Sequence, residues 1–166
     1  LFNTADFNSP INVLMTGGGA PGAAGIIRCL SLNNRIRIVA ADKNEQAAGR
    51  YLAHDFVKIP AADDPTFIFS LLSVCREKNI HLVLPLVTRE LIPLSAHARD
   101  FEMAGARLLI SSVESLEIAN NKSRLYEFLQ WRGIPVPAFR VVENTEQFSA
   151  AVTALGFPVN PVCFKP

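Results

Sequence analysis

This 166-residue sequence has few cysteines, almost no net charge and no long apolar run. Cys29, Cys75 and Cys163 are far apart, which argues against a disulfide framework or a metal set and favours a reducing, cytoplasmic compartment. Cys29 and Cys75 fall in helical patterns, where we expect buried thiols. The 16 basic and 15 acidic residues leave a net charge of +1 without a basic run, so no nucleic-acid partner is predicted. Pro85 and Pro93 interrupt the apolar stretches, so no membrane span is predicted.

What the sequence does contain is an alternation of strand-like and helix-like segments. Short apolar runs predict strands, and apolar residues spaced i, i+3, i+4 predict helices between them. We expect strands at 11–16, 36–41, 55–59, 82–85 and 107–110. The alternation predicts an α/β fold, a Rossmann-like parallel sheet with helices on both faces and right-handed crossovers.

Polar residues and prolines mark the expected helix boundaries. Two helices are expected at 22–32 and 45–52. Asp64 is predicted to cap the next helix, with Pro65 as its first residue. Pro93 is unfavourable inside a helix, so the helix before the fifth strand is expected to begin near it.

A glycine-rich turn, TGGGAPGAAG at residues 16–25, follows the first expected strand. Gly17, Gly19 and Gly22 spell G-x-G-x-x-G, and Gly18 adds another position without a Cβ. In one interpretation the turn and the first N–H groups of the next helix face an anion or a polar ligand. In the other, the turn serves only to pack the helix against the sheet.

Polar residues also follow the second and fourth expected strands. Asp42 either accepts a hydrogen bond from a ribose hydroxyl or caps the helix at 45–52. Thr88 and Glu90 either face the same ligand as the glycine turn or serve the next helix, Thr88 as its cap and Glu90 at its positive end. Because parallel strands end at one edge of a sheet, these residues predict a shared site there.

The pattern changes after residue 110. Asn120 or Asn121 is predicted to cap a helix that runs to Arg132, and the Gly-Ile-Pro-Val-Pro segment at 133–137 is predicted to be an extended linker. Beyond it we expect a strand at 138–142, a helix capped by Thr145, and a strand at 162–166.

These elements predict the domain organisation. Residues 1–10 are expected to form a flexible tail, 11–132 a Rossmann-like domain with linking helices, and 138–166 an incomplete lobe. One helix and two strands bury too little apolar surface to stand alone. The sequence opens with Leu1 rather than Met, so we expect a fragment of a longer protein.

From Ile11 onward the chain contains, in this order, TGGGAPGAAGIIRCL, VAAD, AAGRYLAHDFVKIP, LPLVTREL, NNKSRLYEFLQWRGIPVP, and LGFPV leading to FKP. In the order and spacing of these motifs the chain resembles the ATP-grasp ligases, in particular the branch like the large subunit of carbamoyl-phosphate synthase. This resemblance implies that the first part is the family's pre-ATP-grasp domain and that the last residues begin the nucleotide-clamping lobe.

The resemblance also implies roles for individual residues. Lys122 matches a cation that reaches toward the phosphates of ATP, and Lys165 matches the lysine of the family's "KP" strand, which contacts them. The alternative for each is an exposed lysine without a ligand. The glycine turn, Thr88 and Glu90 match positions that border the acceptor substrate.

Family enzymes use ATP and Mg²⁺ to phosphorylate a carboxylate, and an amine or ammonia then displaces the phosphate. The sequence ends before the family's glycine-rich lid and acidic metal ligands, and Asn160-Pro161 lengthens the segment before Lys165. We therefore expect no metal ligand, no catalytic residue and no catalysis by this segment alone. A homodimer is left open.

Two other interpretations compete with a ligase. A stand-alone NAD-binding Rossmann domain explains the glycines and Asp42, but it leaves Lys122 and the proline-rich linker unexplained. His54, His81 and His97 are expected to be surface or packing residues without partners, so none suits hydride transfer. The third interpretation is a regulatory module that keeps the fold without activity.

Overall fold

A computed structural model describes residues 10–165, which divide into two compact units, Leu1–Glu117 and Ile118–Pro166. The tail predicted at 1–10 lies outside the described residues except for Pro10. The division between units falls upstream of the segment 133–137, which stays a predicted linker. No helix among the described residues has the length and apolar character needed to cross a bilayer.

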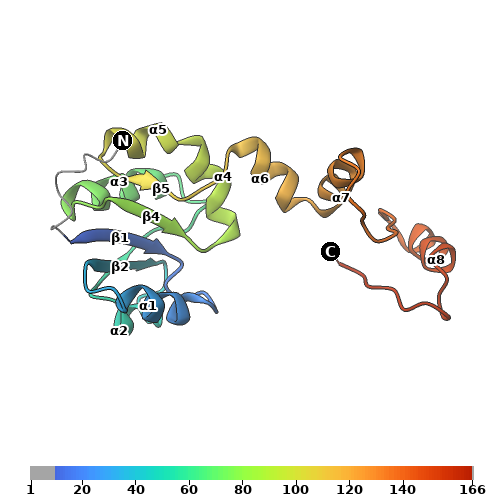
Figure 1. Ribbon diagram of the computed structural model, residues 1–166, viewed down its shortest axis with the longest axis horizontal. Helices are drawn as coiled ribbons and strands as arrows, with labels where there is room; N and C mark the ends of the chain where they lie inside the picture. The colour runs from blue at the N-terminus through green and yellow to red at the C-terminus, as the bar shows by residue number, and fades with distance from the viewer. Residues whose placement is uncertain (1–9, 166) are drawn as a thin grey trace. The chain divides into compact units, whose positions relative to one another are not determined.

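The first unit contains a five-stranded parallel sheet of β1 (Ile11–Thr16), β2 (Ile36–Asp42), β3 (Asp55–Lys58), β4 (Leu82–Pro85) and β5 (Arg107–Leu108) (Figure 1). The strand order is β3-β2-β1-β4-β5. The predicted α/β fold is therefore confirmed. β5 is shorter than expected, although Leu109 still donates its N–H to the carbonyl of Val83 at 2.9 Å.

Helices cover both faces of this sheet. One layer consists of α1 (Ala23–Ser31) and α2 (Gly49–Leu52), and the other of α3 (Phe67–Glu77), α4 (Thr88–Ala96) and α5 (Ala98–Met103) (Figure 1). Successive strand residues alternate between the two cores: Leu14 packs with Phe67 and Phe101, whereas Met15 packs with Ile27. This alternation follows from the pleat of a strand.

Three helix starts differ from the prediction. The carboxylate of Asp64 accepts from the N–H and hydroxyl of Thr66 and so forms a turn, and α3 begins only at Phe67. The helix expected at 45–52 is reduced to α2, after a turn in which Asn44 accepts from the N–H of Gln46. Pro93 lies inside α4 rather than at its start, because burial of Glu90 and Leu94 on either side holds the segment in place.

The predictions for the histidines and for Cys29 were partly wrong. Nδ1 of His54 accepts from the N–H of Ile38 at 3.1 Å, Nδ1 of His81 accepts from the N–H of Asn12 at 3.0 Å, and His97 pairs with Asp100. His54 and His81 stand just before β3 and β4, so their rings continue the strand pairing beyond the strands. Cys29 is exposed on α1, whereas Cys75 is buried, and burial raises the pKa of its thiol to about 12.

α6 (Val113–Asn120) spans the division between the units, and the second unit continues with α7 (Lys122–Trp131) and α8 (Thr145–Ala154). The side chain of Asn121 caps α7 by accepting from the N–H of Arg124. Asn144, rather than Thr145, caps α8 by accepting from the N–H of Gln147. An asparagine one residue before the helix makes the better N-cap because its side chain reaches the N3 amide.

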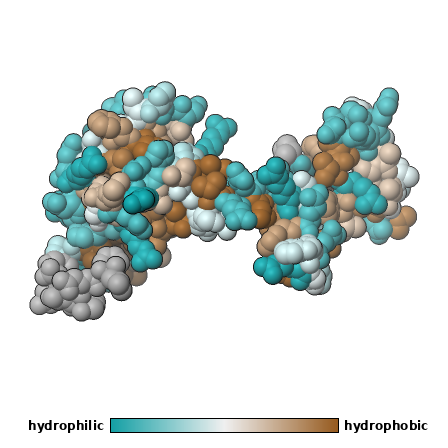
Figure 2. All heavy atoms as spheres, turned by 90° about the horizontal axis from the view of Figure 1, so that it is seen from above, coloured by the Kyte–Doolittle hydropathy of each residue, from teal (hydrophilic) through white to brown (hydrophobic). Residues whose placement is uncertain are grey.

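The strands predicted at 138–142 and 162–166 are absent from the described part of the second unit. A strand requires a partner with which to exchange backbone hydrogen bonds, and neither segment has one among the residues that the structure describes. No residue of α7 or α8 is buried. Figure 2 shows apolar residues, coloured brown, reaching the surface of the chain.

Candidate functional site

The order of the strands identifies the part of the sheet where a ligand is expected. The chain runs outward in one direction from β1 to β2 and β3, and in the other direction to β4 and β5. In open parallel sheets, ligands bind beyond the carboxyl ends of the strands at such a switch point. Thr16 at the end of β1 lies opposite Pro85 at the end of β4, so the two following loops are neighbours.

The glycine turn packs tightly at this edge. Gly17 has a φ of +70°, and a Cβ at that position would lie 2.6 Å from Cγ2 of Val87. Gly18 donates its N–H to the carbonyl of Ala41 at 3.0 Å and accepts from the N–H of Gly49 at 2.9 Å. Gly17 and Gly18 are buried, so they bring the loops after β1, β2 and β4 into contact. Gly19 and Gly22 are exposed.

Asp42 holds two of these loops together. Its Oδ2 accepts from the N–H of Gly19 at 2.7 Å, and its Oδ1 accepts from the N–H of Asn44 at 2.8 Å. The predicted cap for a helix at 45–52 is thus wrong in detail, because the carboxylate caps a turn and the helix begins later, at Gly49. Both carboxylate oxygens already accept a backbone N–H, which leaves Asp42 less available to a ribose hydroxyl than a free side chain would be.

Glu90 is the buried charged residue of this edge. It lies in the first turn of α4, only 7% of its surface is exposed, and its Oε2 accepts from the hydroxyl of Thr16 at 2.5 Å. Burial raises the pKa of the Glu90 carboxyl, the Thr16 hydrogen bond lowers it, and the negative charge of Asp42 raises it again. The predicted position of Glu90 at the positive end of a helix agrees with its place in α4.

The structure gives two threonines roles that the sequence did not predict. Thr88 is exposed, is the first residue of α4 and makes no capping bond, so the prediction that it caps this helix was wrong. Thr16 is fully buried and donates its hydroxyl to Glu90, a contact that the sequence pattern did not predict. The sequence feature that could have identified Thr16 is its hydroxyl at the end of a mostly apolar strand.

Lys122 and Lys165 belong to the second compact unit, not to the unit that holds the glycine turn. Lys122 is the exposed first residue of α7, immediately after the Asn121 cap. Lys165 is exposed in a segment without a strand, so its predicted place on a strand was wrong. The structure therefore brings together the glycine turn, Asp42, Thr88 and Glu90, and describes each lysine only within its own unit.

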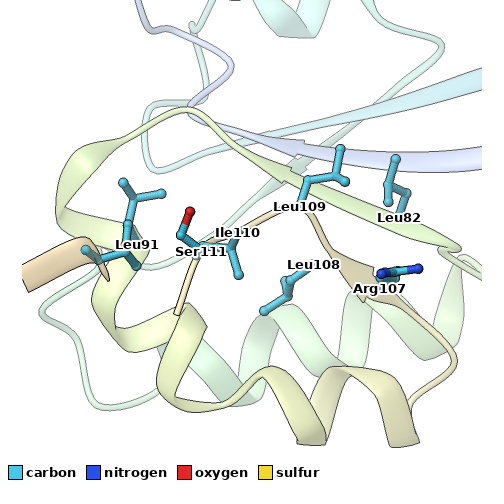
Figure 3. Close-up of a pocket in the computed structure, with 8 residues that line it drawn as sticks. Leu82, Leu91, Arg107, Leu108, Leu109, Ile110 and Ser111 are labelled. Carbon is cyan, nitrogen blue, oxygen red and sulfur yellow. The ribbon is translucent and has the colours of Figure 1, made fainter. Parts of the chain in front are cut away.

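Two surface hollows lie elsewhere. One, of about 640 Å³, runs along β5 and the segment that follows it, as Figure 3 shows, and its lining is mostly leucine with Arg107 at one end. The other, of about 440 Å³, lies beside β3 and has Arg50, His54 and Lys58 in its wall. Neither hollow is lined by a residue that the sequence predicted for the site.

Comparison with protein families gives a match over residues 13–109 to the model described as "PylC-like, N-terminal domain". The formate-dependent phosphoribosylglycinamide formyltransferase of Burkholderia thailandensis is 27% identical over 157 residues, which cover 93% of this chain and 37% of that protein. The carbamoyl phosphate synthase large chain of Archaeoglobus fulgidus is 37% identical over 62 residues, 37% of this chain and 6% of that protein.

Solved structures share the fold. N5-carboxyaminoimidazole ribonucleotide synthetase in complex with ADP superposes with a TM-score of 0.65 at 18% identity, covering 90% of this chain and 37% of that one. The biotin carboxylase domain of a single-chain bacterial carboxylase gives a TM-score of 0.59 at 21% identity, covering 88% of this chain and 34% of that one. The chain thus spans little more than a third, at most, of the length of these relatives and structures.

Proposed function

From its membership of the PylC-like N-terminal domain family, an N-terminal portion of ATP-grasp ligases, we propose that this chain supplies part of the substrate and ATP cleft of an ATP-dependent carboxylate–amine ligase. The observation that supports this most is the meeting of the glycine turn, Asp42 and the Thr16–Glu90 pair beside the switch point of the sheet. The chain spans little more than a third of the relatives that it matches, so we propose the reaction for a protein that carries this chain together with the rest of such a ligase.

In the proposed reaction, a substrate carboxylate attacks the γ-phosphorus of ATP, an acyl phosphate forms and ADP leaves. An amine or ammonia then attacks the acyl carbon, inorganic phosphate leaves with the bonding electrons, and the nitrogen gives up a proton. The protein contributes chiefly by positioning the reactants and neutralising charge. Lys122, at the positive end of α7, and Lys165 are the proposed phosphate contacts.

The substrate side of the cleft is proposed to lie at the edge formed by β1, β2 and β4. Gly19, Gly22 and Thr88 are exposed there, whereas Gly17 and Gly18 hold the loops in place. ATP and Mg²⁺ are the cofactors proposed for the protein that carries this chain. Residues 10–165 contain no group of three or more His, Cys, Asp or Glu side chains able to hold a metal. A homodimer and a cytoplasmic location stay predictions.

A binding experiment tests the proposal against an NAD-binding domain. The full-length protein that carries this chain is titrated with ATP–Mg²⁺ and, separately, with NADH, and its melting temperature is followed. We expect ATP–Mg²⁺ to raise the melting temperature, since a ligand that binds only the folded state stabilises it. Stabilisation by NADH alone would favour the dinucleotide domain, although Asp42 and the Gly19 N–H already bind each other.

An activity experiment tests the proposal against a regulatory module. The same protein is incubated with ATP–Mg²⁺ and a panel of carboxylates and amines, and ADP release is measured. Release that requires both a carboxylate and an amine is the expected result. Variants Lys122→Met and Lys165→Met should raise the KM for ATP. ATP binding without ADP release under any combination would point to the non-catalytic module.

A further inference from the structure

The Glu90 carboxylate has one occupied oxygen and one that is available. Oε2 accepts from Thr16, and Oε1 has no hydrogen-bond partner among the described residues. No side-chain oxygen or nitrogen in the described part of the chain is both fully enclosed and unpaired, so Oε1 keeps some accessible surface. Glu90 is 7% exposed as a residue, and Oε1 accounts for part of that exposed surface.

The charges around Glu90 are negative. β1 contributes the neutral hydroxyl of Thr16, and the end of β2 contributes Asp42, whose charge acts on Glu90. The connection from β4 to α4 contributes Leu86 and Val87, which are apolar, and Arg89 on α4 is exposed. Two carboxylates without a contacting cation favour a ligand group that brings a positive charge and disfavour phosphate.

We infer that Thr16 is a positioning residue, which binds Oε2 of Glu90 and leaves Oε1 to an ammonium group of the ligase's amine substrate; the ammonium gives up one proton to solvent before the neutral amine attacks the acyl phosphate. This inference rests on the proposed function and deepens it, because it names the charge of the group bound at this edge. The Thr16 hydroxyl cannot serve a ligand directly, since it is fully buried and already donates to Glu90. Its effect is exerted through Glu90.

Thr16 opposes the effect that burial has on the pKa of Glu90. Burial favours the neutral acid and so raises the pKa of Glu90, while a hydroxyl that donates to the carboxylate favours the charged form. Only the charged form pairs with an ammonium group. Removal of the hydroxyl should therefore weaken ammonium binding most at the pH values where Glu90 becomes protonated.

The first measurement follows Glu90 itself. The protein is labelled with ¹³C at glutamate carboxyl carbons, the Glu90 signal is assigned by its loss in Glu90→Gln, and its titration is recorded in each variant. Thr16→Val, which keeps the shape of the side chain, should move the titration to higher pH. Thr16→Ser should restore it, and Thr88→Val, at the exposed neighbour, should leave it unmoved.

The second measurement uses ammonium chloride as the probe, with sodium chloride at equal ionic strength as the control. Above the titration midpoint, ammonium should shift the Glu90 signal saturably, and its affinity should fall at least about tenfold in Thr16→Val and recover in Thr16→Ser. An unmoved titration in folded Thr16→Val, or an ammonium response no larger than the sodium response, would overturn the inference. Neither measurement needs ATP, so a protein that releases no ADP refutes the ligase while these results still decide the role of Thr16.

Discussion

Helices α3 and α7 are similar in length, with 11 and 10 residues, but α3 buries Phe67, Leu71, Val74 and Cys75 whereas α7 buries none. The same contrast separates the two compact units. The buried apolar residues, from Val13 to Leu116, all precede residue 118. Local signals start helices in both units, but among residues 10–165 the sheet on which helices pack belongs to the first unit.

The second unit relies on contacts between aromatic rings that are only partly buried. Tyr126 packs edge-on against Phe139 with 5.1 Å between ring centroids, and the guanidinium of Arg132 lies 5.1 Å from the centroid of Trp131. Trp131 itself is 75% exposed. Such contacts contribute little compared with a buried core, so we expect the two units to differ strongly in their response to mutation.

The largest expected effect comes from truncating a buried ring. Phe101→Ala removes a fully buried side chain of the first unit and should cost about 3–5 kcal/mol of unfolding free energy. The matched change Phe148→Ala in the second unit, where the ring is 39% exposed, should cost about 0.5–1.5 kcal/mol. Urea denaturation followed by amide exchange of β1 and by the fluorescence of Trp131 measures the two units separately. Equal costs would show that the second unit has a core of its own.

A pair of glycines sharpens the comparison. Gly17 and Gly133 have φ values of +70° and +71°, but a Cβ meets Val87 at Gly17 and open space at Gly133. Alanine should cost about 1–2 kcal/mol at either position for the left-handed backbone, and about 1–3 kcal/mol more at Gly17 for the steric contact. Each substitution lowers the unfolding free energy of its own unit. The amount by which the loss at Gly17 exceeds the loss at Gly133 measures this contact. Equal losses for Gly17→Ala and Gly133→Ala would contradict this prediction. They would mean that the loops at the edge of the sheet move apart at little cost to admit the methyl group.

A smaller change probes local stability in the second unit. Asn121→Ala removes the side chain that accepts from the N–H of Arg124 and should destabilise α7 by about 1 kcal/mol. We expect a loss of helical circular dichroism and faster amide exchange in α7. Amide exchange in β1 should be unchanged. If β1 responds as well, the two units unfold together and the comparison fails.

The smallest expected effect concerns an ion pair of the first unit. The Lys78 ammonium, 2.8 Å from Asp55, lowers the pKa of that carboxyl below its ordinary 3.8. Its stabilisation is therefore present above the unfolded pKa and is lost as pH falls through the folded one. Both side chains are about a third exposed, so Asp55→Asn should cost only about 0.2–1 kcal/mol near neutral pH. Denaturation of both proteins at neutral pH and at about pH 2–3 should show the difference closing, and a constant difference would contradict the linkage.

Much of the first unit was predictable because its strands are short apolar runs separated by amphipathic helices. All five strands were expected within one or two residues of where they lie. The second unit was predicted less well, since segments 138–142 and 162–166 have the composition of strands but no partner to pair with. At Pro93 the sequence predicted a helix start, but the residue lies inside α4, where the next residue, Leu94, is buried.

The candidate site divides in a similar way. The sequence predicted that the glycine turn, Asp42 and Glu90 gather at one edge, because polar residues at strand ends are visible along the chain. It did not predict that Asp42 binds Gly19 or that Thr16 binds Glu90, since these pairs are 23 and 74 residues apart. Thr16 was missed for that reason.

The sequence by itself determined the alternating pattern, the parallel sheet and the family, because apolar periodicity and motif spacing are local properties of the chain. Only the tertiary structure decided which polar groups are paired and which remain available. Burial and long-range hydrogen bonding depend on which residues the fold places next to each other. For this reason Asp42 accepts from the backbone of two loops, whereas Oε1 of Glu90 has no partner among the described residues and is not fully enclosed.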